Sequence, residues 1–306
     1  MRVVHHRAPL APVVLEGLAQ RFDRVAGPQE PLGQPGTVAV VTNGGLGLSA
    51  ESMALLPELR VVSCFGAGHE GVDLEAARAR GIWVTHAPGT NTATVADHAI
   101  GLMLAITRGF HASDREVRAG NWDQARKPRP TLNGGRLGIL GFGLIGAQIA
   151  RRAAAFDMAI AYHTRRARPD VPWRHVGSVL DLARESDVMV LACPGGAATR
   201  HLVNAEVLEA LGPEGFLVNI ARGSVVDTAA LVAALQAGRI AAAALDVVDG
   251  EPVVPAALLA APNLLLTPHV AGRSPASLLA QRQTLFASID AALAGGRPQH
   301  VLAGPD

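Results

Sequence analysis

The sequence of 306 residues contains few cysteines and few aromatic side chains. Its two cysteines, Cys64 and Cys193, each lie at the end of an apolar run that is typical of a strand. We therefore predict that both thiols are buried and act as small hydrophobic side chains. The sequence has no C-x-x-C pair and no cluster of cysteine and histidine, so we expect no metal site.

The sequence also has almost no net charge and no long hydrophobic run. Lysine and arginine number 27 against 26 aspartate and glutamate, which gives no electrostatic case for binding nucleic acid or an anionic membrane. No apolar run approaches the roughly 18 residues of a membrane span. The opening residues, MRVVHHRAPLAP, lack the charged and apolar regions of a signal peptide. We therefore expect a cytoplasmic protein without nucleic acid or membrane partners.

The composition is that of a folded chain of more than one domain. Hydrophobic residues make up 49% of the sequence and charged residues 17%, which is typical of globular proteins. This length favours about two domains. Short strand-like runs alternate with helical spacings, which predicts parallel α/β layers. We expect one long helix over residues 94–119, ended by Gly120, and a last helix over residues 275–294.

The stretch Leu137–Gly146 carries the most informative local pattern. An apolar strand-like run leads into a G-x-G-x-x-G turn, formed by Gly141, Gly143 and Gly146, and a helical run follows. In dinucleotide-binding proteins the first glycine permits the turn, the second lets a pyrophosphate approach the backbone, and the third lets the helix pack close to the strand. The pattern predicts a dinucleotide site at the helix N-terminus.

Two other segments have a functional and an ordinary explanation. Gly45 and Gly47 begin a second G-x-G-x-x-A match after a strand, but the helix that follows is short and Ser49 is a good N-cap, so we favour a plain turn. His5 and His6 either end the first strand or line a cleft.

Three polar residues that follow predicted strands could perform chemistry on a carbonyl compound. His269 follows an apolar strand, where open α/β sheets place ligands, and histidine exchanges protons near neutral pH. Glu251 precedes it by 18 residues and could orient the imidazole. Arg222 offers a planar fork that suits a carboxylate. Each residue alone also has a structural explanation, as a strand-end, turn or solvated residue.

The end of the second strand in the predicted nucleotide domain indicates which dinucleotide binds. NAD proteins usually place Asp or Glu about 20 residues after the first glycine. Here the strand ends in His163, Thr164, Arg165 and Arg166, and Asp157 lies before the strand. A hydroxyl and two guanidinium groups suit a 2′-phosphate. We predict a preference for NADP, with NAD as the alternative cofactor; a solvated basic loop is the other explanation.

The whole chain resembles the D-isomer-specific 2-hydroxyacid dehydrogenase family. The resemblance rests on the glycine turn and on four further stretches, in this order: Val95-Ala96-Asp97-His98-Ala99, Asn219-Ile220-Ala221-Arg222-Gly223-Ser224-Val225-Val226-Asp227, Leu245-Asp246-Val247-Val248-Asp249-Gly250-Glu251-Pro252 and Leu266-Thr267-Pro268-His269-Val270-Ala271-Gly272.

This resemblance implies an α/β fold of two doubly wound parallel-sheet domains. Residues 96–271 would form a Rossmann NAD(P)-binding domain, and residues 1–95 with 272–306 a smaller flavodoxin-like substrate domain. The active site would lie in the cleft between them. The long helix near 94–119 usually helps to form a homodimer in such proteins.

The resemblance also assigns residues. Arg222, Glu251 and His269 would be catalytic. The loop Gly66-Ala67-Gly68 would hold the acid end of the substrate through its N–H groups, together with Arg222 and His269. The cofactor contacts would be Gly141, Phe142, Gly143, Leu144, Ile145, Gly146, His163, Thr164, Arg165, Arg166, Cys193, Pro194, Thr199, Ile220, Ala221, Arg222, Asp246, His269 and Ala271.

Within the family the sequence is most similar to the glyoxylate/hydroxypyruvate reductase branch. That branch implies reduction of a small 2-oxo acid to the D-2-hydroxy acid by hydride transfer from NADPH. Oxidation of formate or phosphite on the same fold is an alternative, although formate dehydrogenases usually have Gln where Glu251 stands. A dinucleotide-sensing corepressor is a third hypothesis. Those proteins carry extra tails, whereas this sequence ends at Asp306, soon after its last predicted helix.

Overall fold

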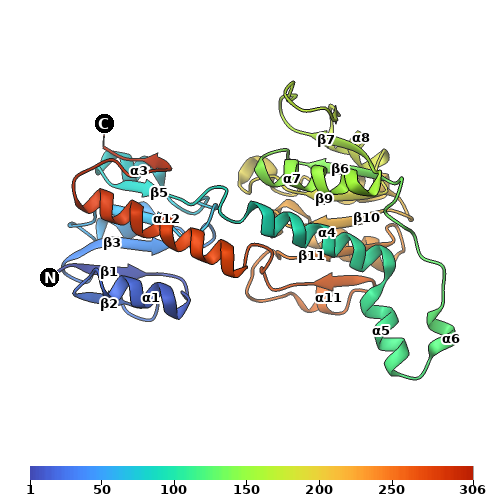
Figure 1. The fold of residues 1–306 in the computed structure, drawn as a ribbon, viewed down its shortest axis with the longest axis horizontal. Helices are drawn as coiled ribbons and strands as arrows, with labels where there is room; N and C mark the ends of the chain where they lie inside the picture. The colour runs from blue at the N-terminus through green and yellow to red at the C-terminus, as the bar shows by residue number, and fades with distance from the viewer. Residues whose placement is uncertain (306) are drawn as a thin grey trace. The chain divides into compact units, whose positions relative to one another are not determined.

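The computed structural model describes residues 1–305, and the chain forms two compact units (Figure 1). The first unit comprises Met1–Asn91 and Ser274–Asp306, and the second comprises Thr92–Arg273. Each unit is built around its own sheet, with strands that alternate with helices along the chain. The predicted α/β class is confirmed. No helix within residues 1–305 is long and apolar enough to cross a membrane.

The first unit has a six-stranded sheet in the order β2-β1-β3-β4-β5-β13. The first five strands are parallel, and β13 runs antiparallel to β5. This order is the flavodoxin-like one that the family resemblance implied. The elements are β1 (Val3–His6), α1 (Pro12–Ala19), β2 (Arg24–Ala26), β3 (Thr37–Thr42), α2 (Ala50–Ala54), β4 (Val61–Cys64), α3 (Leu74–Ala79), β5 (Trp83–Thr85), α12 (Pro275–Leu293) and β13 (Val301–Ala303).

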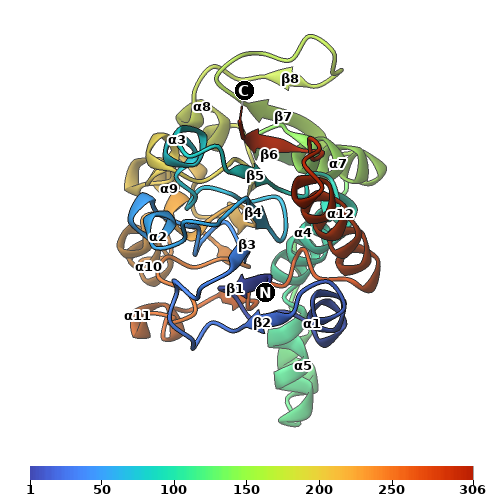
Figure 2. The same cartoon turned by 90° about the vertical axis from the view of Figure 1, so that its left-hand side faces the viewer.

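Helices cover both faces of this sheet (Figure 2). Alternate residues of a strand point to opposite faces. Ala39 and Val41 of β3 therefore pack with α1 and α12, whereas Val40 packs with α2 and α3. Helices α1 and α12 lie so close that a Cβ at Gly17 would meet the ring of Phe286 at 2.4 Å. The unit thus has two apolar layers, one on each side of the sheet.

The second unit has a seven-stranded parallel sheet in the order β8-β7-β6-β9-β10-β11-β12, the Rossmann order extended by one strand. Its elements are α4 (Thr92–Arg108), α5 (Phe110–Arg118), α6 (Trp122–Ala125), β6 (Arg136–Leu140), α7 (Leu144–Ala153), η1 (Ala154–Phe156), β7 (Ala159–His163), β8 (Arg174–His175), α8 (Val179–Arg184), β9 (Val188–Leu191), η2 (Ala197–Thr199), α9 (Ala205–Leu211), β10 (Phe216–Asn219), η3 (Gly223–Val225), α10 (Thr228–Gln236), β11 (Ala242–Leu245), α11 (Ala256–Leu259) and β12 (Leu264–Leu266).

The second sheet is also covered on both faces. Helices α4 and α7 pack on one face, where Met103 and Ile149 are fully buried against the strands. Helices α8 to α11 cover the other face, represented by Leu182 and Leu231. Strands buried on both faces are near-continuous apolar runs, which explains why β9 and β10 were easy to predict from the sequence.

The prediction of one helix over residues 94–119 is wrong at Gly109. Helix α4 ends at Arg108 and α5 begins at Phe110, because Gly109 takes the left-handed conformation with φ 63° and ψ 38°. Glycine adopts that conformation without the steric cost that a Cβ would carry. Apolar residues keep their helical spacing across Gly109, from Ile106 to Phe110, so this periodicity alone did not predict the break. The short elements β2, β8, β13, α6 and α11 were not predicted either.

Candidate active site

The candidate site lies at the carboxyl ends of the strands in the second unit. In an open parallel sheet, ligands bind where the strand order reverses. Here that point is β6, which pairs with β7 on one side and β9 on the other. The glycine turn follows β6 directly, and the loops that follow β9, β10, β11 and β12 begin at the same edge of the sheet. The turns that carry the predicted residues therefore meet at one edge.

The three glycines of the turn have different surroundings. Gly141 has φ 94°, and a Cβ there would lie 2.5 Å from the backbone of Cys193. A Cβ at Gly146 would lie 2.3 Å from the carbonyl oxygen of Gly141. Gly143, by contrast, is exposed and has no atom within 4 Å of such a Cβ. The first and third glycines thus permit close packing, and the second leaves open space beside the backbone.

This open space fits the pyrophosphate of a dinucleotide. Gly143 is the N-cap of α7, so the unpaired N–H groups and positive dipole end of that helix lie next to it. No acidic side chain lies in the first turn of α7 to repel a phosphate. The side chain of Phe142 is buried against Tyr162 and Trp173, so only its backbone is available to a ligand.

Two arginines at the end of β7 are exposed and unpaired. Arg165 and Arg166 follow β7, and within residues 1–305 neither guanidinium group makes a hydrogen bond or ion pair. Arg168 differs, since it pairs with Asp170 and donates to the carbonyl of Phe142 at 3.1 Å. Thr164 Oγ1 donates to the carbonyl of Arg166 at 2.6 Å, which shapes this loop.

The ring of His163 is fixed by its neighbours. Its Nδ1 lies 2.8 Å from the carbonyl of Val176, and the ring stacks on His175 with centroids 6.0 Å apart. With Nδ1 engaged, Nε2 is the nitrogen left for a ligand. The segment 163–166 therefore presents one imidazole edge and two guanidinium groups beside the glycine turn.

The loop after β9 packs beneath Arg222. Cys193 is buried, and burial raises the pKa of its thiol to about 11. Thr199 Oγ1 donates to the carbonyl of Pro194 at 2.9 Å and closes the loop. A Cβ at Gly195 would lie 2.7 Å from Cγ of Arg222, so this glycine makes room for the arginine stem. This role of Gly195 was not predicted from the sequence.

The turn after β10 is braced by a buried asparagine. Asn219 is fully buried; its Oδ1 accepts from the N–H of Ala221 at 3.0 Å, and its Nδ2 donates to the carbonyl of Arg222 at 2.9 Å. Ile220 and Ala221 are buried, whereas Arg222 is half-buried. Asn219 is the first residue of the family-like stretch 219–227, but its role in holding the turn of Arg222 was not predicted.

His269 and Glu251 form a hydrogen-bonded pair. His269 Nδ1 contacts Glu251 Oε1, and both side chains remain partly exposed. Burial alone would raise the pKa of Glu251, but the hydrogen bond and charge of His269, the N–H of Val248 and the charge of Arg222 together lower it. The carboxylate thus stays ionised beside the imidazole. A Cβ at Gly223 would lie 2.1 Å from the backbone at Val248, so the loops of Arg222 and Glu251 touch.

Of the other predicted residues of this unit, Leu144 is exposed and Ile145 is partly buried on α7, whereas Asp246 and Ala271 are buried. Asp246 is buried and accepts hydrogen bonds from the N–H groups of Val270, at 2.9 Å, and Ala271, at 3.0 Å. Ala271 is also buried. Both residues therefore hold the loop of His269 in place.

In the first unit, the loop after β4 presents unused backbone donors. Within residues 1–305 the N–H groups of Gly66, Ala67 and Gly68 donate no hydrogen bond. Their carbonyls are used instead: Ala87 N–H donates to Gly66 at 2.7 Å, and His86 Nδ1 lies 2.9 Å from the oxygen of Ala67. Successive backbone N–H groups without a protein acceptor are suited to hold an anion.

The second glycine turn of the sequence is packed shut. A Cβ at Gly47 would overlap the backbone of Gly71 at 1.8 Å, and Ser49 caps α2 by accepting from the N–H of Ser52. The structure thus supports the plain-turn interpretation. His5 and His6 end β1 and are buried, and Cys64 is buried as predicted.

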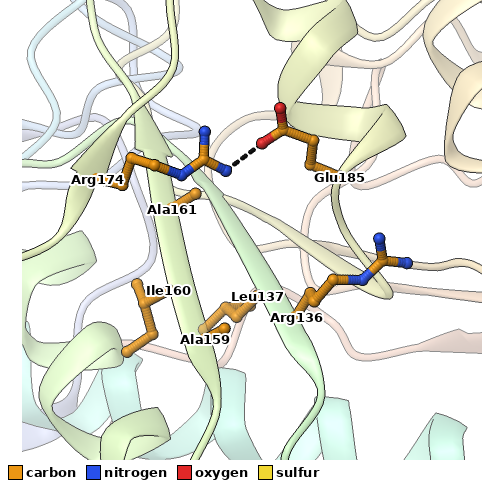
Figure 3. Close-up of a pocket in the computed structure, with 7 residues that line it drawn as sticks. All are labelled: Arg136, Leu137, Ala159, Ile160, Ala161, Arg174 and Glu185. Carbon is orange, nitrogen blue, oxygen red and sulfur yellow. Dashed lines mark hydrogen bonds and ion pairs between the residues drawn. The ribbon is translucent and has the colours of Figure 1, made fainter.

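A separate pocket of about 240 Å³ lies at the amino ends of β6 and β7 (Figure 3). It is lined by Arg136, Leu137, Ala159, Ile160, Ala161, Arg174 and Glu185. Its arginines are paired, Arg174 with Glu185 and Arg136 with Asp187. It is at the opposite end of the strands from the glycine turn. No group of three or more potential metal ligands occurs within residues 1–305.

The fold and the glycine turn define the second unit as a dinucleotide-binding Rossmann domain. Residues 100–271 match the family model described as D-isomer specific 2-hydroxyacid dehydrogenase, NAD binding domain. The chain is also 42% identical, over 84% of its length, to glyoxylate/hydroxypyruvate reductase A of Arabidopsis thaliana, of which it covers 82%. The chain belongs to the D-isomer specific 2-hydroxyacid dehydrogenase family, whose members are NAD(P)-dependent oxidoreductases.

Two further relatives show the range of the family. The 2-ketogluconate reductase of Gluconobacter oxydans is 42% identical over 86% of both chains. The NADPH-dependent glyoxylate/hydroxypyruvate reductase of Sinorhizobium meliloti, solved with NADP and malonate, aligns with a TM-score of 0.90 at 37% identity, covering 99% of this chain and 97% of that one.

Proposed function

We propose that this protein reduces a small 2-oxo acid, such as glyoxylate or hydroxypyruvate, to the D-2-hydroxy acid with NADPH. The observation that carries the proposal is the His269–Glu251 pair, with Arg222 on the adjoining loop, at the carboxyl edge of the NAD-binding domain. The reductase relatives support the same reaction class.

His269 is the proton donor in this proposal. Bound NADPH supplies the hydride. Because Nδ1 of His269 contacts the ionised Glu251, the proton on Nε2 is the one available to the carbonyl oxygen of the substrate. Glu251 accepts the hydrogen of Nδ1 and thereby orients the ring.

Arg222 binds the substrate carboxylate and polarises the carbonyl. Its planar fork can hold both oxygens, and its stem is fixed over Gly195 by the turn that Asn219 braces. We assign the other end of the carboxylate to the free N–H groups of Gly66, Ala67 and Gly68. This makes the unit Met1–Asn91 with Ser274–Asp306 the substrate domain.

NADPH is preferred over NADH because the strand end of β7 carries cations and no carboxylate. Arg165 and Arg166 receive the 2′-phosphate, with His163 and Thr164 beside them. The pyrophosphate lies over Gly143, and the remaining contacts come from residues of the neighbouring loops: Gly141, Phe142, Leu144, Ile145, Gly146, Cys193, Pro194, Thr199, Ile220, Ala221, Asp246 and Ala271.

We also propose a cytoplasmic homodimer. Helices α5 and α6 expose large apolar side chains, Phe110, Val117 and Trp122, at 42% to 63% of their surface. A second copy could cover them. Light scattering of the purified protein at micromolar concentration tests the dimer, and a monomeric mass would contradict it.

The test of the function is a substrate panel. Purified protein is mixed with NADPH and glyoxylate, hydroxypyruvate or longer 2-oxo acids, and with NADP⁺ and formate or phosphite. We expect the absorbance of NADPH to fall with at least one 2-oxo acid. Turnover of formate or phosphite alone would replace the proposal by an NADP⁺-dependent dehydrogenase of those anions, and NADPH binding without any turnover would indicate a dinucleotide sensor.

A further inference from the structure

His269 is held in a backbone conformation that non-glycine residues rarely adopt. Its φ is 51°, in the left-handed region. Such residues persist when their surroundings determine the conformation, and they occur often at functional sites. The hydrogen bonds around the loop Thr267–Ala271 therefore decide how the imidazole is presented.

The buried Asp246 organises this loop from beneath. Its carbonyl accepts from the N–H of His269 at 2.8 Å. Its carboxylate accepts from the N–H groups of Val270 and Ala271, and from the hydroxyl of Thr267 at 2.6 Å. Only 1% of the Asp246 side chain is exposed. Four hydrogen bonds to residues around and including His269 thus end on a single residue.

His98 completes the network from helix α4. Its Nε2 lies 3.2 Å from Thr267 Oγ1 and 3.5 Å from Asp246 Oδ1. The Thr267 hydroxyl has one hydrogen, which it donates to Asp246, so it must accept the hydrogen of His98 Nε2. The result is a donor chain from His98 through Thr267 to Asp246, in which each bond polarises the next.

We infer that His98 is a positioning residue for the reaction. It fixes the Thr267 hydroxyl and the Asp246 carboxylate, and through them the backbone that presents His269. The inference rests on the proposed role of His269. Since a small misplacement of a catalytic group can cost about 10²-fold in rate, losing this donor lowers kcat far more than it weakens NADPH binding, because most of the proposed NADPH contacts lie outside this network.

The test compares three single variants with the wild type. His98→Leu removes the donor. His98→Gln keeps it, because a glutamine amide reaches the position of the imidazole Nε2. Asp97→Ala is the matched control, since Asp97 is the neighbouring residue on α4 and pairs with Arg152 on α7 at 2.6 Å, away from this network.

We expect kcat to fall at least about tenfold in His98→Leu, with the Kd of NADPH changed by less than about threefold. His98→Gln should recover most of kcat, and Asp97→Ala should match the wild type. Hydrogen exchange gives a readout that does not depend on activity: the amides of Val270 and Ala271 should exchange faster in His98→Leu, whereas the amides of α7 that lie in its helical hydrogen bonds should not.

Unchanged exchange or unchanged kcat in His98→Leu would overturn the inference, as would an equal loss of kcat in His98→Gln. If the wild type turns over no 2-oxo acid while the exchange result appears as expected, the proposed function fails and the loop-positioning role of His98 stands on the exchange. General destabilisation by the leucine would accelerate exchange in α7 as well, and that outcome would also count against the inference.

Discussion

Replacing Arg165 and Arg166 by alanine should convert the protein from a preference for NADPH to a preference for neither cofactor. Both residues are exposed at the end of β7, and within residues 1–305 their guanidinium groups have no partner to lose. The double substitution should therefore leave the fold intact. NADPH and NADH differ only in the 2′-phosphate, so their ratio isolates the contribution of these two side chains.

The size of the effect follows from the exposure of the two arginines. A hydrogen bond to a charged group contributes about 1.5–3 kcal/mol, and solvent screening at exposed positions reduces this toward about 1 kcal/mol. Two such contacts give about 2 kcal/mol, which corresponds to roughly thirtyfold in an equilibrium constant. We expect the ratio of kcat/KM for NADPH over NADH to fall by about that factor.

The assay is initial-rate kinetics with both cofactors at a saturating 2-oxo acid. The control is the double variant Arg151→Ala/Arg174→Ala, which removes the same charge from the same domain. Arg151 lies in the last turn of α7, and Arg174 pairs with Glu185 in the pocket of Figure 3. Surface substitutions of this kind usually change free energies by less than about 0.5 kcal/mol, so its ratio should stay within about twofold.

Two results would refute the reasoning. Equal kcat/KM for NADPH and NADH in the unaltered protein would mean that no 2′-phosphate site exists. A similar fall in the control variant would mean that net charge, rather than these two side chains, attracts NADPH.

Three further predictions concern the glycine turn, the catalytic pair and a buried histidine. Gly143→Ala should keep the melting temperature, because its Cβ meets no protein atom, but should weaken NADPH binding at least about tenfold. Gly146→Ala should lower the melting temperature, because its Cβ would collide with the carbonyl oxygen of Gly141. Glu251→Gln should lower kcat/KM at least about tenfold, because a neutral amide oxygen is a weaker acceptor for the imidazole Nδ1 of His269 than the carboxylate it replaces. Burial, followed by the charge of His6, lowers the pKa of His5. The unfolded chain therefore takes up this proton first as the pH falls, and the melting temperature should decrease below about pH 6.5, less steeply in His5→Leu.

Each of these predictions has a contrary outcome. Equal NADPH affinity in Gly143→Ala would place the pyrophosphate elsewhere. A wild-type kcat/KM in Glu251→Gln would show that the carboxylate does not orient the imidazole of His269. An identical pH dependence of melting in His5→Leu would assign the acid sensitivity to other groups.

Local patterns were enough to predict parallel α/β layers and the dinucleotide turn, and the family resemblance added the flavodoxin-like fold of the first unit. The apolar strands, the glycine turn and the alternation of strands with helices are encoded in short segments, and the two sheet orders confirmed them. The turn of Gly141, Gly143 and Gly146 could be interpreted residue by residue, because Gly141 and Gly146 leave no room for a Cβ and Gly143 leaves open space beside the backbone.

Features that depend on distant partners could not be predicted. Strand β13 pairs with β5 from the other end of the chain, and His98 contacts Thr267 across 169 residues. The hydrogen bond from Asn219 to the carbonyl of Arg222 and the space that Gly195 leaves for the Arg222 stem also arise only when these loops meet at the sheet edge. The break between α4 and α5 has a different cause. Gly109 can be seen in the sequence, but a helix can tolerate a single glycine, so its presence did not predict a break.

The most direct test of the central claim is to compare the wild type with His269→Ala in two measurements, kcat for NADPH-dependent reduction of glyoxylate or hydroxypyruvate and the Kd of NADPH by fluorescence titration. General acid catalysis typically contributes about 10²- to 10⁴-fold, so we expect kcat to fall within that range while the Kd of NADPH stays the same. A wild-type kcat in the variant would contradict the account.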